Sequence, residues 1–135
     1  MIRRVLVGLV LWTWLSSIAL AHEIRPAYLE IKETAPGQYT VLWRTPVLAG
    51  MRLPLALTLP ANVTNLKPPL LQELTDSLVE RRWIDAGPNG LAGKRVEIRG
   101  LQFTITDALV RVELLDGRTV QTIARASAEQ ATATE

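Results

Sequence analysis

The sequence predicts an all-β fold, a single β-sandwich of the immunoglobulin-like kind that follows an N-terminal signal peptide. Two observations predict this fold. Short runs in which apolar and polar residues alternate recur along the chain, and glycine and proline turn signals separate them. A length of 135 residues supports one core of ordinary size, so these runs, about seven or eight strands, are expected to share it.

The first 21 residues have the composition of a secretory signal peptide. Arg3 and Arg4 precede an apolar run that starts at Val5, and Ala19-Leu20-Ala21 supplies small residues for cleavage after Ala21. An uncleaved leader would instead anchor the chain in a membrane, but polar residues interrupt the run, which is short for a bilayer core needing about 20 residues. We therefore expect a leader over residues 1–21 and a periplasmic or other extracytoplasmic location.

Charge and cysteine content exclude several classes of protein. Fifteen lysines and arginines stand against 13 acidic residues, but Arg3 and Arg4 lie in the leader, so 13 of each sign remain. No basic patch with interleaved aromatic residues is left, which argues against nucleic acid as a partner. The absence of cysteine removes disulfides, thiolate metal sites and cysteine nucleophiles, so a hydrophobic core must hold the domain.

Residues 27–44 predict the first β-hairpin. Apolar residues alternate with polar ones on both sides of Ala35-Pro36-Gly37-Gln38, where proline presets φ and glycine tolerates the positive φ of a turn. Pro46 is expected to end the second strand of this hairpin. Residues 53–59 carry a leucine at every second position and predict a third strand, which Pro54 would place at a sheet edge.

Residues 61–77 fit two structures. Leu70, Leu74 and Leu78 are spaced by four residues, as in a short helix that Pro68-Pro69 would begin. A strand with a polar loop fits the same segment.

The C-terminal half of the chain predicts further strands at residues 78–85, 96–98, 108–114 and 119–123. The last two flank Asp116-Gly117, a strong hairpin signal. Trp43 and Trp83 both lie on alternating runs, so we expect them to be the large core residues, with stacking on a ligand as the alternative. The sandwich is expected over residues 22–125, and residues 126–135, which have no apolar periodicity, predict a disordered tail or linker.

The side chains that carry most enzyme chemistry are scarce, so we predict that the chain is not an enzyme. His22 is the only histidine, and a general base at a chain terminus is poorly held against a nucleophile. The carboxylates are interspersed with arginines and nothing selects a catalytic pair among them. No glycine-rich loop leads into a helix to bind phosphate, and no small-molecule substrate is identified.

His22 offers the one candidate metal site in the sequence; otherwise no cofactor is predicted. After cleavage its amine and imidazole nitrogens could chelate Cu(II) or Ni(II) together, although the residue can equally be incidental to the cleavage site. The chelate predicts that isothermal titration finds weaker Cu(II) and Ni(II) binding for a His22→Ala variant of the processed chain. Identical affinities would refute it.

Asp107 and Arg111 form a second pair of interest. Residues four apart on a strand share a face, so both would point the same way as Leu109. A carboxylate at the start of a strand ordinarily makes turn or cross-strand hydrogen bonds, and a binding role is the alternative.

Three segments of the chain together resemble a known family. They are residues 22–30 (HEIRPAYLE), residues 37–43 (GQYTVLW), and Gly100-Leu101 followed by residues 106–112 (TDALVRV). As an ordered set that covers most of residues 22–125, they resemble the N-terminal extracytoplasmic region of bacterial HupE/UreJ-like membrane proteins. In that family the region is β-rich and precedes a bundle of transmembrane helices associated with nickel or cobalt uptake.

The chain departs from that family after residue 125, where no apolar segment long enough to span a bilayer follows. It also lacks the membrane-embedded histidines of the family, so no transport residue can be carried over. The chain would be either a truncated product or a stand-alone relative of the soluble region. The resemblance implies an accessory or interaction module beside a membrane protein or membrane domain encoded nearby, and the alternative is a protein that binds or delivers Ni, Co or Cu.

Overall fold

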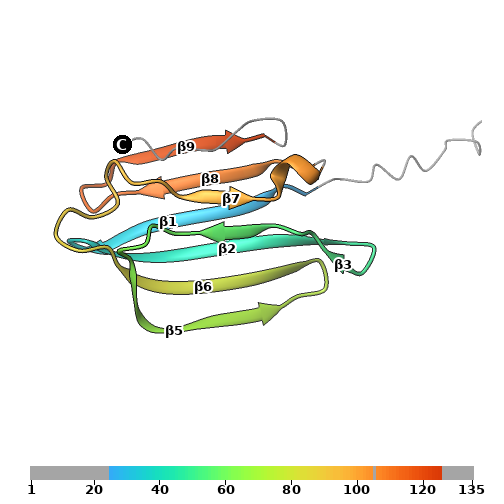
Figure 1. The fold of residues 1–135 in the computed structure, drawn as a ribbon, viewed down its shortest axis with the longest axis horizontal. Helices are drawn as coiled ribbons and strands as arrows, with labels where there is room; N and C mark the ends of the chain where they lie inside the picture. The colour runs from blue at the N-terminus through green and yellow to red at the C-terminus, as the bar shows by residue number, and fades with distance from the viewer. Residues whose placement is uncertain (1–24, 105, 126–135) are drawn as a thin grey trace, which may run out of the picture.

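The computed structural model describes residues 25–104 and 106–125, which form β-strands and one short 3-10 helix (Figure 1). The predicted signal peptide, His22 and the predicted tail lie outside these residues. No α-helix occurs within the described ranges. The elements in chain order are β1 (Ala27–Ala35), β2 (Gln38–Leu48), β3 (Met51–Arg52), β4 (Ala56–Thr58), β5 (Thr64–Glu73), β6 (Ser77–Asp85), β7 (Glu97–Arg99), η1 (Leu101–Phe103), β8 (Ala108–Glu113) and β9 (Thr119–Ala124).

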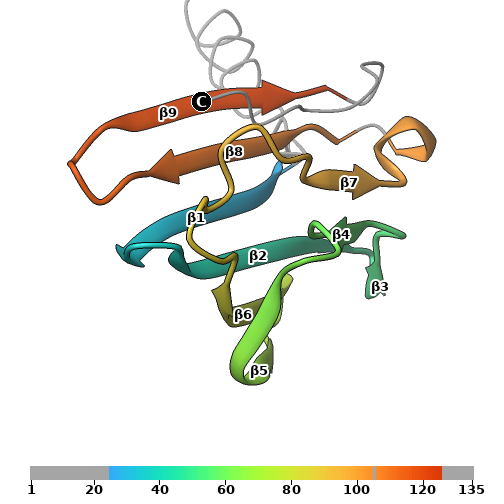
Figure 2. The same ribbon diagram turned by 60° about the vertical axis from the view of Figure 1, so that its left-hand side comes forward.

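Two sheets of unequal size build the domain. The large sheet has the order β5-β6-β2-β1-β8-β9, and β3 extends it by pairing with the end of β2. Its neighbours are antiparallel except β1 and β8, which are parallel. The small sheet contains β4 and β7 alone. It lies over one face of the large sheet, here called the inner face (Figure 2).

The core lies between the small sheet and the inner face. Side chains of a strand alternate between the two faces, and here the odd-numbered residues of β1 and β2 point inward. Burying these apolar side chains supplies the main favourable free energy of folding. The buried residues of this core are Ala27, Leu29, Ile31, Tyr39, Val41, Trp43, Leu57, Ile84, Ala86, Val96, Leu101, Ala108, Val110 and Ala124.

The all-β prediction is confirmed, as are both predicted hairpins, which join β1 to β2 and β8 to β9. The immunoglobulin-like topology is not confirmed. Immunoglobulin constant domains divide seven strands into sheets of four and three, whereas here six strands follow one path and a single pair faces them.

Two predicted strand boundaries in the first half were wrong. Pro46 does not end β2, which continues to Leu48 and pairs Pro46 with Ser77 of β6. Only Ala56–Thr58 of the predicted strand over residues 53–59 is a strand. Of the two structures that fitted residues 61–77, the strand is present, as β5.

β5 is an edge strand that is exposed along its whole length. Pro68 and Pro69 lie within it, and its register against β6 shifts twice, between Asn65 and Lys67 and between Lys67 and Leu70. Proline and irregular pairing are ordinary protections of a sheet edge against association with other strands.

No helix within the described part of the chain has the length and apolar character needed to cross a membrane.

Candidate functional site

A groove opens on one side of the sandwich, where the small sheet stops short of β6. Figure 2 shows β5 and β6 extending beyond β4. The cavity has a volume of about 410 Å³, within the range of about 300–1,000 Å³ typical of ligand sites. We call it the Trp43 groove. It is lined by Trp43, Thr45, Arg52, Leu53, Pro54, Leu55, Ala56, Leu57, Leu78, Glu80 and Arg82.

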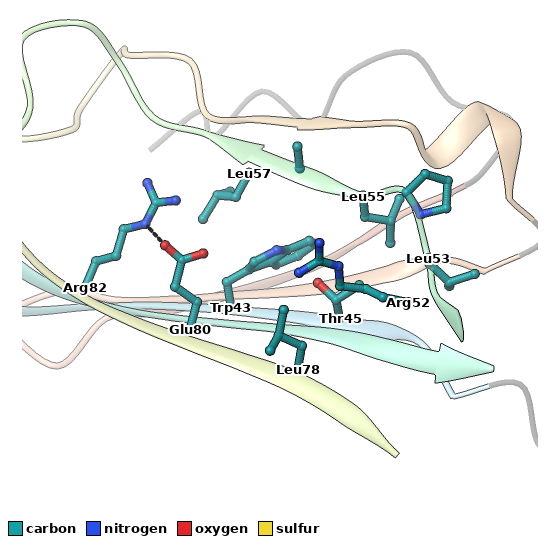
Figure 3. A pocket seen from close by; sticks show the side chains of 11 residues that line it. Trp43, Thr45, Arg52, Leu53, Leu55, Leu57, Leu78, Glu80 and Arg82 are labelled. Atoms are coloured by element: carbon teal, nitrogen blue, oxygen red, sulfur yellow. Dashed lines mark hydrogen bonds and ion pairs between the residues drawn. The ribbon is translucent and has the colours of Figure 1, made fainter. Parts of the chain in front are cut away.

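The register between β2 and β6 builds the floor of the Trp43 groove. Trp43 lies opposite Glu80, and Thr45 lies opposite Leu78, so these side chains are direct cross-strand neighbours on the inner face. The segment from Arg52 to Leu57 forms the facing wall (Figure 3). The pairing of β2 with β6 thus fixes the floor of the groove, and the chain leading into β4 supplies the facing wall.

The edge of β4 gives the groove unpaired backbone. Within residues 25–104 and 106–125, β4 pairs only with β7, so its other edge has no strand partner there. Ala56 and Leu57 of β4 line the groove. A free strand edge offers backbone N–H and C=O groups to an added strand.

Two charged residues that line the groove, Glu80 and Arg82, form an ion pair with each other. Arg82 Nε donates to Glu80 Oε1 at 2.5 Å, and both side chains are largely shielded, with 26% and 19% of their surfaces exposed. Among the described residues, Glu80 is the only carboxylate that lines the groove. Its charge is therefore balanced within the groove by Arg82.

Arg52 contributes a second positive charge with no acidic partner among the described residues. Its guanidinium reaches back beside Trp43 and above Thr45 (Figure 3). The Thr45 hydroxyl and the Trp43 indole N–H make no hydrogen bond within the described ranges, although these residues are only 2% and 4% exposed. Neither polar atom is fully buried, because Arg111 Nε is the one buried side-chain atom without a partner among the described residues. Both are therefore open to a hydrogen-bonding ligand in the groove.

The arrangement is suited to binding. A free guanidinium beside a hydroxyl and an indole N–H recognises an anionic oxygen, above all a carboxylate. The leucines at positions 53, 55, 57 and 78 provide an apolar surface beside it. The groove therefore fits a chain segment that carries a carboxylate next to apolar side chains.

The prediction of two core tryptophans is right for Trp43 and wrong for Trp83. Trp83 is paired with Thr40 and lies on the opposite, outer face of the large sheet, where it is half-buried. Lys67 of β5 covers it, with Nζ 3.9 Å from the ring centroid. The core residue of β6 is instead Ile84, which is fully buried.

Asp107 and Arg111 lie away from the Trp43 groove. Asp107 immediately precedes β8, and its backbone carbonyl accepts a hydrogen bond from Ala27 N at 2.9 Å. Arg111 is on the outer face beside Glu30 of β1, and its Nη2 is 3.7 Å from Glu113. The Asp107 backbone bond and the position opposite Glu30 belong to the pairing of β1 with β8, whereas the Arg111–Glu113 ion pair lies within β8.

A polar cluster surrounds Arg111 on the outer face. Tyr28 donates from its hydroxyl to Glu30 Oε2 at 2.8 Å, and Arg44 lies over the Tyr28 ring, 5.6 Å from its centroid. Burial raises the pKa of the Tyr28 phenol, and the hydrogen bond and charge of Glu30 act in the same direction. Arg111 Nε is buried without a hydrogen-bond partner in the described ranges.

The candidate metal ligand His22 lies outside the described residues. Within residues 25–104 and 106–125, no group of three or more His, Cys, Asp or Glu side chains is placed to hold a metal ion.

Sequence reasoning missed the charged residues of the groove, although a signal was present. Leu78 and Ile84 mark one face of their strand as apolar, and Glu80 and Arg82 occupy the two positions between them on that face. Charged residues at such positions indicate a face that is covered only in part. No comparable pattern singles out Arg52.

The fold and groove define the chain as an all-β sandwich domain with an open lateral groove. Comparison with protein-family models, curated proteins and solved structures finds no match to this chain.

Proposed function

We propose that this chain is an exported, non-catalytic interaction domain that binds a segment of a membrane protein in the Trp43 groove. The single observation that carries the proposal is the Arg52 end of the groove. There an exposed guanidinium without an acidic partner among the described residues lies beside the Thr45 hydroxyl and the Trp43 indole N–H, which make no hydrogen bond within those residues. A ligand that carries an anionic oxygen gains charge-assisted hydrogen bonds from these groups.

An extended peptide fits the groove better than a compact small molecule. The groove runs along the free edge of β4, so a bound strand can pair with that edge while its side chains reach the floor. Alternate residues of such a strand point the same way, so one carboxylate can meet Arg52 while apolar neighbours contact Leu55 and Leu78. The resemblance to the soluble region of HupE/UreJ-like membrane proteins supports a membrane protein as the source of this segment.

Site-specific photo-crosslinking tests the proposal in cells that make the chain. A photo-reactive amino acid replaces Leu78 in the groove, and Gln121 on the distant edge strand β9 serves as the control position. We expect a membrane-protein adduct from position 78 that position 121 does not give, and mass spectrometry identifies it.

A charge reversal supplies the matched control. Arg52→Glu is expected to lower the adduct yield roughly tenfold, since it replaces a charge-assisted hydrogen bond with repulsion. Arg81→Glu makes the same change on the outer face of β6 and should leave the yield unchanged. Equal adducts from positions 78 and 121, or a yield insensitive to Arg52→Glu, would refute the proposed function.

A further inference from the structure

The two most exposed large apolar side chains in the described ranges are Met51, at 72%, and Phe103, at 80%. Met51 begins β3, directly after the turn at Ala49-Gly50. Phe103 is the last residue of η1. Neither belongs to the core or lines the Trp43 groove, so the fold leaves both without an internal partner.

Met51 and Phe103 lie at the same end of the molecule. Met51 pairs with Leu48 at the end of β2. The residue before η1, Gly100, packs so closely on the segment after β3 that a Cβ there would lie 2.1 Å from the Pro54 carbonyl oxygen. Figures 1 and 2 show β3 and η1 together at one end of the sandwich, which we call the apolar end.

Both ends of the described chain also lie at the apolar end. Ala27 at the start of β1 pairs with Ala108, which pairs in turn with Ala124 at the close of β9. Arg25 lies two residues before β1, and Arg125 directly follows β9. Arg25 forms an ion pair with Asp76, whereas Arg125 has no ion pair within the described ranges. In the sequence, the apolar run that begins at Val5 comes shortly before this end.

We propose that the apolar end docks on the surface of an anionic phospholipid membrane. Single exposed apolar side chains at one end of a domain, with the unpaired Arg125 at the same end, suit the interface of a bilayer, where apolar side chains enter the acyl boundary and cations meet acidic headgroups. The apolar run before Arg25 enters the chain at this same end, so a leader still in the bilayer would hold Met51 and Phe103 toward the lipid. The surface is separate from the groove that would hold the partner segment.

Vesicle binding of the exported protein, purified as the cell processes it, tests this inference. The probe is a vesicle of phosphatidylcholine with about 30% phosphatidylglycerol, compared with phosphatidylcholine alone. Phe103→Asp is expected to lower partitioning onto the mixed vesicles roughly tenfold, because an exposed phenylalanine that would enter the bilayer is replaced by a charge that acidic lipid repels. Leu115→Asp is the control, since Leu115 is also exposed, at 53%, in the β8–β9 turn at the opposite end.

A fluorescent probe locates the docking face. The chain has no cysteine, so Met51→Cys and Leu115→Cys each provide a single site for a polarity-sensitive dye. We expect the dye at position 51 alone to shift to shorter wavelength on mixed vesicles. Equal shifts at both positions, no shift at either, or self-association through the apolar end without vesicle binding would overturn the inference. Photo-crosslinking from position 78 should survive Phe103→Asp, so failure of this inference and of the proposed function are distinguishable.

Discussion

Trp43→Ala is expected to lower the free energy of unfolding by about 3–5 kcal/mol. Trp43 is 4% exposed and lies in the core cluster between β2 and the small sheet. Truncation removes its apolar contacts and leaves a cavity, and the adjoining groove lets water into part of that cavity, which places the loss toward the lower end of the range. A domain of this size is stabilised by only about 5–15 kcal/mol in total, so the variant should unfold at much lower urea concentration, as followed by circular dichroism.

Trp83→Ala is the matched control for this prediction. Trp83 is half-buried on the outer face, so its truncation leaves no enclosed cavity and removes chiefly the contact with Lys67. We expect a loss of about 1–2 kcal/mol, from partial burial and a cation–π contact worth about 0.5–1 kcal/mol at an exposed site. Equal losses for the two tryptophans would show that the inner and outer faces have been assigned wrongly.

The two tryptophans also show how far alternation alone can predict a core. A period of two places neighbouring residues on opposite faces, but it does not say which face a second sheet will cover. Both faces of β6 mix apolar and charged residues, with Leu78 and Ile84 on one and Val79 and Trp83 on the other. The covered face is decided by the small sheet, whose strands β4 and β7 are far apart in the sequence.

Proline positions explain the misplaced boundaries in the same physical terms. Pro46 was expected to stop a strand because it has no N–H for a ladder. The pairing of β1 with β2 ends at Tyr28 and Arg44, so Pro46 lies beyond it and pairs with β6, while Leu53 N donates to its carbonyl oxygen at 3.4 Å. Pro68 and Pro69 are tolerated in β5 because that strand is an edge with one neighbour. Whether a proline ends a strand therefore depends on neighbours that local sequence does not reveal.

The groove was predictable only in part. Its floor follows from alternation, because Trp43 and Thr45 share a face of one predicted strand, and Leu78 and Glu80 share a face of another. The pairing of those strands, and the return of Arg52 over Trp43, depend on β3 and on the segment that leads into β4. Strands of two and three residues carry too little periodicity to predict such a wall.

Gly37→Ala is expected to lower the free energy of unfolding by about 3 kcal/mol or more. Gly37 occupies the β1–β2 turn with φ of +74°, and a Cβ there would lie 2.2 Å from the carbonyl oxygen of Gly87. That carbonyl cannot easily retreat, because Ala86 N donates to Gly37 O at 2.8 Å and Gly87 N donates to Asp85 Oδ1 at 2.7 Å. Left-handed backbone costs a non-glycine residue about 1–2 kcal/mol, and the clash with fixed backbone adds a further 1–3 kcal/mol or so.

Gly117→Ala separates these two costs by the same urea titration. Gly117 occupies the β8–β9 turn with φ of +89°, but no atom lies within 4 Å of a Cβ built there. Its loss should therefore be the backbone strain alone, about 1–2 kcal/mol. Sequence predicts a turn glycine at both positions, whereas only the folded chain brings Gly37 against the segment after β6. Equal losses at the two glycines would mean that this close approach contributes nothing and that the β1–β2 turn is held only by its own conformation.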